Sequence, residues 1–559
     1  MVMQTDIPWS LLRHQVIKNC PTIVRGIERF CFCCAVSNGA QRSWVVHSSA
    51  DTFERCWQQL QQHCTELVAA KNLTVVYLRI DWVTAATPLK IHELVKILRN
   101  TKRNYYRFGL AFDHELQQLY TEQELNANAL LYAGSNISYC QLNPHNFDVY
   151  QQRRFAKKLP NPCELGPDQP VWQLETQGVF LDTDGQVHLL YPSGPNASRR
   201  QLPELTDRQL GSIINQASDY LAKQVQVDGR YHYGVFPCFH RPIQTYNTLR
   251  HASSTYALIE AFEFTPRPDV RSAIERALQA LTQQMLLYKT DASGQRLAFL
   301  QDERNEIKLG GNALCLLALC KYTEVTGSHH YQPLMQQLAA GILSMQNPSN
   351  GRFVHVLNSD DFSVKQEFRI IYYDGEACFA LLRYYAISQQ QRWLDAAALA
   401  FDDFIAREHW KSHDHWLSYS INELVKYRPE AKYFQFGLQN VMGYLDFVIE
   451  RITTFPTLLE LMMAAQQLIL KLEQHPELEH LMKDVDMDKF YFAMHRRAEH
   501  MLNGFFWPEL AIFYRQPDKI IGSFFIRHHA FRIRIDDIEH YLSGYIAYLN
   551  FLQTQAKLT

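Results

Sequence analysis

The stretch YYDGEACFALLRYY, residues 372–385, decides the fold that this sequence predicts. It opens with a short motif of small and polar residues and continues as a nearly apolar run. A helix that is apolar most of the way round is buried, whereas a helix with one apolar stripe lies outside. The same pattern recurs in RHASSTYALIEAF (250–262), KLGGNALCLLALC (308–320), DHWLSYSINELV (414–425) and RIDDIEHYLSGYIAYL (534–549).

Helical periodicity recurs in about twelve segments after residue 205. Most of the even-numbered segments are of this nearly apolar kind, and the odd-numbered ones carry more charge, as in RSAIERALQALTQQ (271–284). Alternating inner and outer helices build a double-walled ring, so residues 206–559 are predicted to form an all-α (α/α)6 toroid of six hairpins. The predicted helices span 207–224, 248–264, 269–288, 310–326, 330–346, 375–388, 392–407, 415–427, 431–451, 457–474, 488–502 and 536–553.

In such a ring the inner helices all run the same way, so their N-terminal motifs gather at one rim around a central cavity. The unpaired backbone N–H groups at helix N-termini favour carboxylate, phosphate or polar sugar groups. We therefore expect a ligand site at this rim. Gly310 and Gly311 lack the lysine, serine and flanking strand of a nucleotide loop, and close helix packing explains them better.

The first 191 residues mix strand and helix signals and are predicted to form an α+β domain of unknown role. Asn38-Gly39 between two β-rich segments is a hairpin turn signal. Residues 192–205 are rich in Pro, Ser and Gly and are predicted to be a linker. The predicted strands are 22–37, 43–49, 75–83 and 106–112, the helices are 51–70 and 91–102, and a last hairpin turns at 182–185.

Composition and charge exclude some classes of function. The 559 residues are 47% hydrophobic and hold 55 Lys and Arg against 57 Asp and Glu, so no general attraction to nucleic acid or an anionic membrane is expected. The N-terminal MVMQTDIPWSLLRHQ lacks the features of a secretory signal, and charged residues interrupt the most apolar stretch, 447–472. We expect a cytoplasmic protein without a transmembrane segment or a nucleic-acid partner.

Twelve cysteines are scattered along the chain, many of them inside apolar runs, which fits a reducing compartment. Cys31, Cys33 and Cys34, with Cys56 and Cys64 downstream, raise a zinc hypothesis. Their spacing matches no usual structural-zinc template. The prediction is therefore no bound metal and no other cofactor, with metal binding by this cluster as the alternative.

Three segments carry a resemblance to a known superfamily: TYNTLRHASSTYALIEAFE (245–263), EIKLGGNALCLLALCKYTEVTG (306–327) and IIYYDGEACFALLRYYAISQQQRWLDAA (370–397). They resemble the hairpins of the six-hairpin glycosidases and of the sugar epimerases that share their toroid, in particular those acting on N-acylglucosamine. The resemblance covers about 350 residues and is one of layout and helix texture, without the complete catalytic motif of any one family. It implies a carbohydrate-active pocket.

Glycosidases of this kind use two carboxylates, and a set of carboxylates stands at the inner-helix starts. Asp374 and Glu376 lie in YYDGEA, and Asp414 lies in DHW. An Asp just before a helix also serves as an N-cap, which is the structural alternative for Asp374 and Asp414. Asp536 and Asp537 are adjacent in RIDDIEH and form either a catalytic pair or a structural network with arginine.

Lyases and epimerases instead move a proton with His or Tyr, and such residues also stand at these helix starts. Three histidines and three tyrosines form this second set, and two arginines are placed to clamp a sugar carboxylate or phosphate. A single His at a helix start is more often a packing residue, but three at equivalent positions favour function. The predicted catalytic residues are Asp374, Asp414, Asp536, Asp537, His251, His415 and His540. The predicted substrate-binding residues are Arg250, Arg534, Tyr233, Tyr372, Tyr373, Glu376 and Trp416.

The leading hypothesis is an enzyme that acts on a sugar, a uronic acid or an oligosaccharide by hydrolysis, lyase elimination or epimerisation. Asp536-Asp537 also bears a superficial likeness to the acidic motifs of cyclases with this toroid, although their other signatures are missing. A third hypothesis is a non-catalytic toroid that binds a glycan, a peptide or a partner protein. A catalytic rim should place at least two ionisable groups with perturbed pKa within ~10 Å of each other.

Overall fold

The computed structural model describes residues 7–21, 24–155, 159–192, 194–202 and 204–558. The chain divides into two compact units. The first unit comprises Met1–Glu204, Val235–Pro242 and Asn503–Ile533, and the second comprises Leu205–Gly234, Ile243–Leu502 and Arg534–Thr559. The predicted division into 1–191, 192–205 and 206–559 stays a prediction, and it does not include the two later segments that join the first unit.

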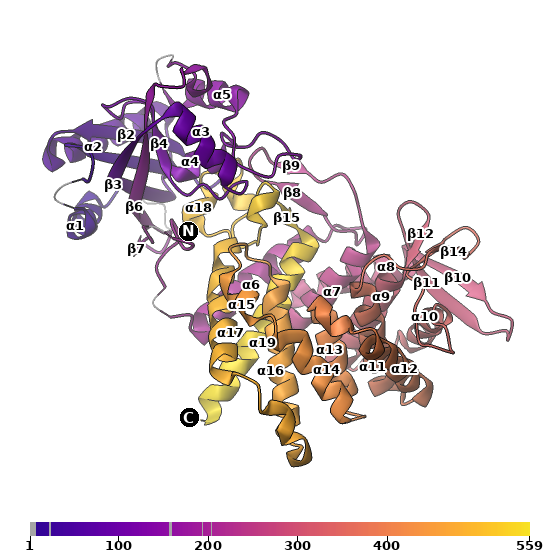
Figure 1. The fold of residues 1–559 in the computed structure, drawn as a ribbon. Helices are drawn as coiled ribbons and strands as arrows, with labels where there is room; N and C mark the ends of the chain where they lie inside the picture. Colours follow the sequence, from indigo (N-terminus) through magenta and orange to yellow (C-terminus); the bar gives the residue numbers. More distant parts are fainter. Residues whose placement is uncertain (1–6, 22–23, 156–158, 193, 203, 559) are drawn as a thin grey trace. The chain divides into compact units, whose positions relative to one another are not determined.

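An antiparallel sheet forms the centre of the first unit (Figure 1). Its strand order is β2-β1-β3-β6-β4-β5, and β7 pairs with β6. The strands are β1 (Phe30–Ser37), β2 (Trp44–Ala50), β3 (Tyr77–Lys90), β4 (Gly109–Ala111), β5 (Leu119–Tyr120), β6 (Pro170–Leu181) and β7 (Val187–Leu189). The predicted hairpin is confirmed because β1 and β2 pair across Asn38-Gly39, where Gly39 takes a φ of +78°. The first strand begins at Phe30, and residues 22 and 23 of its predicted range lie outside the described residues.

Helices bury two separate hydrophobic clusters against this sheet. One cluster packs α1 and α2 on β1 and β3 around Trp57 and Trp82, and the other packs α3, α4 and α5 on β4 and β5 around Leu110 and Phe147. Burial of such side chains stabilises the fold by about 1.5–3 kcal/mol each. The helices of this unit are α1 (Trp9–Asn19), α2 (Phe53–Lys71), α3 (Ile91–Asn100), α4 (Glu122–Ala127), α5 (Pro144–Arg154) and α18 (Pro508–Ala511).

Glu509 shows why a late segment of the chain joins the first unit. Its side chain is fully buried, and its carboxylate accepts a hydrogen bond from Arg200 Nη2 at 2.7 Å. Its backbone carbonyl accepts from Arg79 Nη1 at 2.9 Å, and Arg79 also pairs with Asp81 at 2.7 Å. A buried carboxylate is tolerated only with such partners, so these contacts fix the segment Asn503–Ile533 in this unit. The other added segment carries the short paired strands β8 (Gly234–Phe236) and β9 (Arg241–Pro242).

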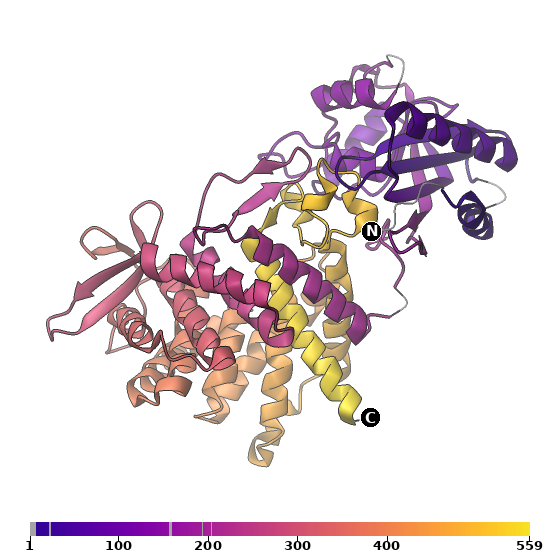
Figure 2. The ribbon, with the colours of Figure 1, turned by 180° about the vertical axis from the view of Figure 1, so that it is seen from behind.

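The second unit is a ring of helices in two layers (Figures 1 and 2). Each of six inner helices contacts the next, and α19 contacts α7, so the ring closes. The inner helices are α7 (Thr248–Phe264), α9 (Leu309–Thr326), α11 (Tyr372–Ser388), α13 (His415–Leu424), α16 (Thr457–Leu472) and α19 (Ile535–Leu558). The outer helices are α6 (Asp207–Gln224), α8 (Pro268–Gln284), α10 (Gln332–Ser344), α12 (Gln391–Ala406), α14 (Ala431–Met442) and α17 (Met487–Met501).

Each of the twelve predicted segments overlaps one of these helices, and the predicted inner and outer sets are the observed ones. Burial explains the sequence pattern: α9 is buried at almost every position from Leu309 to Cys320, whereas the outer helix α8 buries one face. Two ranges need correction. The predicted helix 269–288 ends at Gln284, and its residues 286–288 belong to the strand Leu286–Thr290. The predicted helix 431–451 breaks after Met442 into α14 and the short α15 (Leu445–Glu450).

The helical unit also carries a sheet that the all-α prediction missed. Five strands in the connections before α9 and α11 pair in the order β10-β11-β12-β13-β14. They are β10 (Leu286–Thr290), β11 (Arg296–Asp302), β12 (Glu306–Lys308), β13 (Val356–Asn358) and β14 (Val364–Gln366). A further short strand, β15 (Ile533–Arg534), leads directly into α19.

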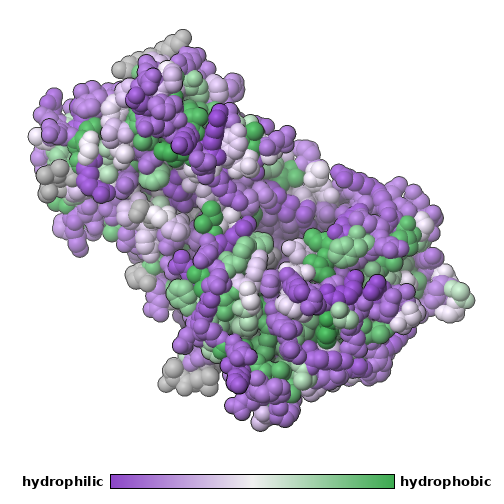
Figure 3. Space-filling view, viewed as in Figure 1, coloured by the Kyte–Doolittle hydropathy of each residue, from purple (hydrophilic) through white to green (hydrophobic). Residues whose placement is uncertain are grey.

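Within the described ranges, none of the helices combines the length and the apolar character that a membrane crossing requires. On the face seen in Figure 3, hydrophobic residues are interspersed with hydrophilic ones over both units.

Candidate active site at the inner-helix starts

The first residues of the inner helices meet one another around the ring. Arg250 of α7 pairs with Asp536 of α19, with 2.8 Å between Nε and Oδ2. His540 of α19 contacts Glu460 of α16, with 2.8 Å between Nδ1 and Oε2. Glu460 in turn lies 4.0 Å from His415 Nε2 at the start of α13. These contacts join four of the six inner helices.

Glycines allow the remaining starts to approach closely. A Cβ added at Gly375 of α11 would lie 2.7 Å from the Cβ of Trp416 on α13. A Cβ added at Gly310 of α9 would lie 1.9 Å from Glu376 Oε2 on α11. Both distances are too short for real atoms, so glycine is required here by packing, as the sequence predicted for Gly310. The expected gathering of the inner-helix starts is thereby confirmed.

We call the charged and polar residues of this ring the rim cluster: Arg250, Glu376, Asp414, His415, Glu460, Asp536, Glu539 and His540. Their side chains are buried, apart from the partly exposed Arg250 and His540. Among the residues that the structure describes, three of their atoms are buried without a hydrogen-bond partner: Glu376 Oε2, Asp414 Oδ2 and His415 Nε2. Each such atom costs about 1–3 kcal/mol unless water or a ligand satisfies it.

Two arginines clasp Asp536. Arg534 donates from Nη2 to Asp536 Oδ2 at 2.7 Å, and Arg250 pairs with the same oxygen. Burial alone would favour the neutral acid, but the two guanidinium groups outweigh it and hold the pKa of Asp536 below its ordinary value. Arg250 also donates to the Tyr233 hydroxyl at 2.7 Å. Asp536 is therefore an ionised member of an Arg and Asp network, with Asp537 3.5 Å from Arg534.

His540 is an imidazolium at neutral pH. Burial alone would lower its pKa, but the carboxylates of Glu539 and Glu460 outweigh burial and raise the pKa of His540 to about 10. Its Nδ1 lies 2.8 Å from Glu460 and 3.4 Å from Glu539. Burial raises the pKa of Glu539, against the opposing effect of His540. His540 is thus a proton donor held in place by a carboxylate.

His415 faces His540. The two ring centroids are 5.3 Å apart, with 77° between the ring planes, and Glu460 reaches both rings. His415 Nδ1 lies 3.4 Å from Asp414, whose other oxygen caps α13 by accepting from Leu417 N at 2.9 Å. The predicted capping role of Asp414 is therefore present, and its other oxygen, Oδ2, lies beside His415 Nδ1 without forming a hydrogen bond to a described residue.

Glu376 is the second acid with a perturbed pKa. Burial first, and then the negative charges of Asp414 and Glu539, raise the pKa of Glu376 well above its ordinary value. Tyr373 packs near it, and the partly exposed Tyr372 lies with its ring centroid 5.7 Å from that of His415. The rim cluster therefore combines neutral acids, ionised acids and an imidazolium in one ring of contacts.

Three predicted catalytic residues are not members of the rim cluster: His251, Asp374, and Asp537, which lies 3.5 Å from Arg534. His251 points toward α8, where its Nε2 lies 2.9 Å from Ala277 O, and its Nδ1 lies 2.8 Å from the Tyr246 hydroxyl. Both ring nitrogens are therefore occupied, and burial lowers the pKa of His251 to about 4. Asp374 faces His355, with 3.2 Å between Oδ2 and Nε2, and lies inside α11 instead of capping it. The predicted N-cap role of Asp374 is wrong.

Trp416 is also turned away from solvent. It is buried against Phe379 and Tyr419, with ring centroids 6.3 and 5.6 Å away. Such a position suits the core more than a sugar-stacking platform.

Sequence reasoning missed Glu460 and Glu539, which govern the protonation of His540. Glu539 lies inside the quoted RIDDIEH motif, next to His540. Glu460 lies in the first turn of α16, and an acid in so apolar a helix was the available signal. Tyr419 donates to Glu460 at 3.2 Å and completes its set of partners.

One group of side chains has the composition of a metal site. Nitrogen and oxygen atoms of His415, Glu460 and His540 lie within 4.8 Å of one another. A metal ion needs a deprotonated imidazole, and the raised pKa of His540 opposes that. The prediction of no metal stays a prediction.

The cysteine cluster is arranged for packing. Cys34 and Cys64 thiols approach within 3.8 Å, and burial raises the pKa of Cys34, which disfavours the thiolate that zinc binds. Among the described residues, the group of His, Cys, Asp and Glu side chains spaced for a metal ion is that of His415, Glu460 and His540, which contains no cysteine.

No protein-family model matches the sequence, and no curated protein matches it. Solved structures do match. A D-mannose isomerase structure is 13% identical, with 62% of this chain and 98% of that one covered at a TM-score of 0.46. The cellobiose 2-epimerase of Bacillus thermoamylovorans is 11% identical, with 62% and 100% covered at a TM-score of 0.46. An α-mannanase of Bacteroides thetaiotaomicron is 10% identical, with 62% and 97% covered at a TM-score of 0.40. The solved structures that this chain is similar to include a sugar epimerase and a glycosidase.

Proposed function

We propose that the rim cluster catalyses proton transfer on a sugar, as an epimerase or isomerase. The observation that carries this proposal is the pair of facing imidazoles, His415 and His540, whose ring centroids are 5.3 Å apart and which share Glu460. A reaction that moves a proton from carbon needs one group to accept it and another to return one. Two imidazoles in different environments supply both roles.

The chemistry proceeds on the carbon next to a sugar carbonyl. His415, whose Nε2 has no hydrogen-bond partner among the described residues, accepts the proton from that carbon. The electron pair of the C–H bond moves into the carbonyl and gives an enediolate. His540, protonated at neutral pH, returns a proton to carbon as the electron pair of the enediolate re-forms the C–H bond, so the proton count balances. Return of the proton to the face opposite the one that lost it inverts the stereocentre.

The carboxylates of the rim position these groups. Glu460 holds His540 by Nδ1 and stabilises its charge, and Asp414 lies beside His415 Nδ1. Arg250 pairs with Asp536 and donates a hydrogen bond to the Tyr233 hydroxyl. These three residues form a polar edge beside the two histidines. Several ionisable groups with perturbed pKa lie in one ring of contacts, which supports a catalytic site over a binding toroid.

A second candidate reaction is hydrolysis of a glycosidic bond. The raised pKa of Glu376 makes it a neutral acid able to protonate a leaving oxygen, and Asp414 supplies a carboxylate. The two buried oxygens without partners, Glu376 Oε2 and Asp414 Oδ2, favour this alternative.

Solvent deuterium separates the two reactions. The protein is incubated in D2O with mannose, glucose, N-acetylglucosamine or cellobiose, and proton NMR follows the carbon next to the carbonyl. Epimerisation introduces deuterium there and forms the epimer, whereas hydrolysis splits a disaccharide without exchange at that carbon. Products without deuterium on carbon would contradict the proposal and favour hydrolysis.

The remaining expectations stay predictions. These are the cytoplasmic location, the absence of a nucleic-acid partner, the choice among sugar, uronic acid and oligosaccharide substrates, and the placement of the activity within residues 206–559.

A further inference from the structure

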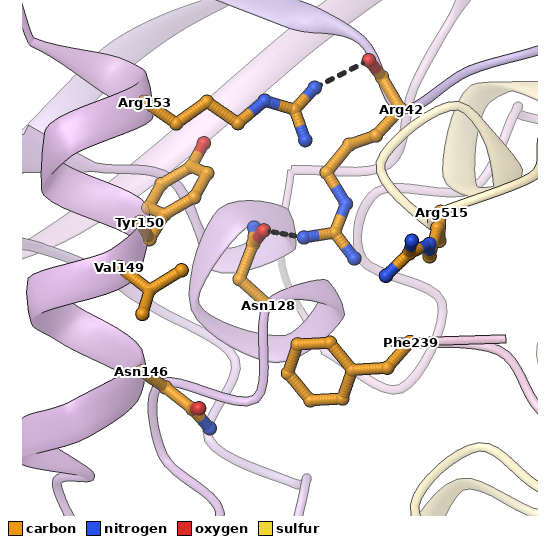
Figure 4. A pocket seen from close by; sticks show the side chains of 8 residues that line it. All are labelled: Arg42, Asn128, Asn146, Val149, Tyr150, Arg153, Phe239 and Arg515. Atoms are coloured by element: carbon orange, nitrogen blue, oxygen red, sulfur yellow. Dashed lines mark hydrogen bonds between the residues drawn. The ribbon is translucent and has the colours of Figure 1, made fainter. Parts of the chain in front are cut away.

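The first unit contains a cavity of about 200 Å³ that is lined by three arginines (Figure 4). Five parts of the unit build it. They are helix α5, the β1–β2 connection, the end of α4 and the two later segments Val235–Pro242 and Asn503–Ile533. The lining residues are Arg42, Asn128, Asn146, Val149, Tyr150, Arg153, Phe239 and Arg515. We call this the arginine cavity.

Arg42 is a buried cation without a carboxylate partner. It is 9% exposed, and its guanidinium donates to Asn128 Oδ1 and to the backbone oxygens of Ala127 and Cys238. Its Nε is buried with no hydrogen-bond partner in the described part of the chain. Burial first, together with repulsion from neighbouring arginines, lowers the pKa of Arg42 to about 10. A buried charge left in this state destabilises the protein unless something else compensates it.

The two neighbouring arginines add to this excess of positive charge. Arg153 donates to the backbone oxygen of Arg42 at 2.7 Å, and Arg515 extends its guanidinium beside that of Arg42 (Figure 4). Within the described residues, none of the three arginines forms an ion pair with a carboxylate. Arginines elsewhere in this unit do so: Arg154, next to Arg153 in sequence, pairs with Glu124 at 2.7 Å.

A purely structural role explains only part of this arrangement. Arg42 holds two backbone carbonyls in place, which uses its Nη atoms. This structural role does not explain why Nε of Arg42 has no hydrogen-bond partner. It also does not explain why Arg153 and Arg515, which are more exposed than Arg42, lie at the same cavity. Like charges that gather without a counter-charge indicate that an anion from outside completes the site.

We propose that the arginine cavity binds a phosphorylated small molecule through its phosphoryl group. Guanidinium groups bind phosphate bidentately, and a phosphoryl group has three acceptor oxygens and up to two negative charges to set against three cations. A carboxylate has two oxygens and one negative charge. It would therefore balance less of the positive charge of the three arginines than a phosphoryl group does. Val149 and Phe239 give the cavity an apolar side for the organic part.

The size of the cavity limits the ligand. Its volume of about 200 Å³ is below the range of about 300–1,000 Å³ typical of sites for larger ligands. One phosphoryl group with a compact organic part is therefore the expected ligand, and polymeric nucleic acid is not.

The test is titration calorimetry of the whole protein with inorganic phosphate and with glucose 6-phosphate at low salt. Arg515→Gln and Arg153→Gln each remove one cation at the exposed mouth and leave the buried Arg42 in place. Each is expected to weaken phosphate binding by about tenfold or more, the effect of one lost hydrogen bond to a charged group. Arg25→Gln is the matched control, because Arg25 is an exposed arginine of the same unit and pairs with Glu175.

The control variant is expected to bind phosphate within about twofold of the unaltered protein, as is His540→Asn, which alters the rim cluster instead. Thermal melts of all four variants check that they fold. The proposal is overturned if the unaltered protein binds neither ligand, if both cavity variants bind as well as it does, if Arg25→Gln weakens binding equally, or if acetate binds as tightly as phosphate.

Discussion

The rim cluster of the second unit and the arginine cavity of the first unit differ in whether their positive charges are paired with carboxylates. In the rim cluster each cation faces at least one carboxylate: Arg250 and Arg534 face Asp536, and His540 faces Glu460. In the arginine cavity Arg42 faces backbone carbonyls and other cations. A compensated cluster sets the protonation states of its own members, whereas an uncompensated one is prepared for a ligand of opposite charge.

The largest effect is expected from His540→Asn in the rim cluster. Loss of a proton donor in the transition state typically costs about 10²–10⁴ in rate, so deuterium incorporation into the sugar should fall by that factor. The NMR exchange experiment measures it. His475→Asn is the control because His475 lies outside the rim cluster and contacts Glu477 in an exposed turn. Equal rates in the His540 variant and the control would remove His540 from the catalytic residues.

A second prediction compares the change in unfolding free energy when one arginine is removed from each region. Arg250→Gln leaves the buried Asp536 with one guanidinium, Arg534, and should lower the free energy of unfolding by about 1–3 kcal/mol. Arg515→Gln removes a cation without an ion-pair partner and should change it by no more than about 0.5 kcal/mol. Urea unfolding measures both. Equal destabilisation by the two variants would show that the two regions do not differ in charge compensation.

Gly310→Ala tests the close packing beneath the rim cluster. Its new Cβ would meet Glu376 Oε2 at 1.9 Å, so the variant should lose about 1–3 kcal/mol of unfolding free energy. Gly443→Ala is the matched control, because Gly443 has open space around its Cβ position and a φ of −71°. That variant should be unchanged or stabilised by about 0.4–1 kcal/mol. A Gly310→Ala protein as stable as the control would mean that the starts of α9 and α11 can move apart.

The last prediction concerns the pH dependence of stability. The pKa of His540 is raised from about 6.5 to about 10, so its contribution to stability is complete below pH 6.5 and is lost as pH rises toward 10. Unfolding free energies of the unaltered protein and of His540→Asn should therefore converge between these pH values. Differences that stay constant from pH 6 to pH 10 would contradict the imidazolium assignment.

Part of the candidate site could be predicted and part could not. His415, His540, Asp414 and Glu376 were found because each stands in a short polar motif at the start of an apolar helix, which is a local pattern. The direction in which a side chain points depends on its neighbours in the fold, and a local sequence pattern does not contain that information. His251 also stands near the start of its helix, yet it turns outward to Ala277 because α8 offers it an acceptor there.

Glu460 is a site residue that the local sequence pattern did not reveal, and it shows the same limit of such patterns. Its helix opens without a polar motif, and its partners His540 and His415 are 80 and 45 residues away in sequence. Only the closure of the ring brings the three together, and no short window of sequence contains that information.

By itself the sequence determined the twelve helices, their sorting into inner and outer walls and the hairpin at Asn38-Gly39, because hydrophobic periodicity and turn chemistry act over a few residues. Only the tertiary structure decided which ionisable groups meet in the rim cluster. It alone also placed the distant segments Val235–Pro242 and Asn503–Ile533 beside Arg42. The physical reason is that pKa values and charge compensation depend on distances in space between residues far apart in the chain.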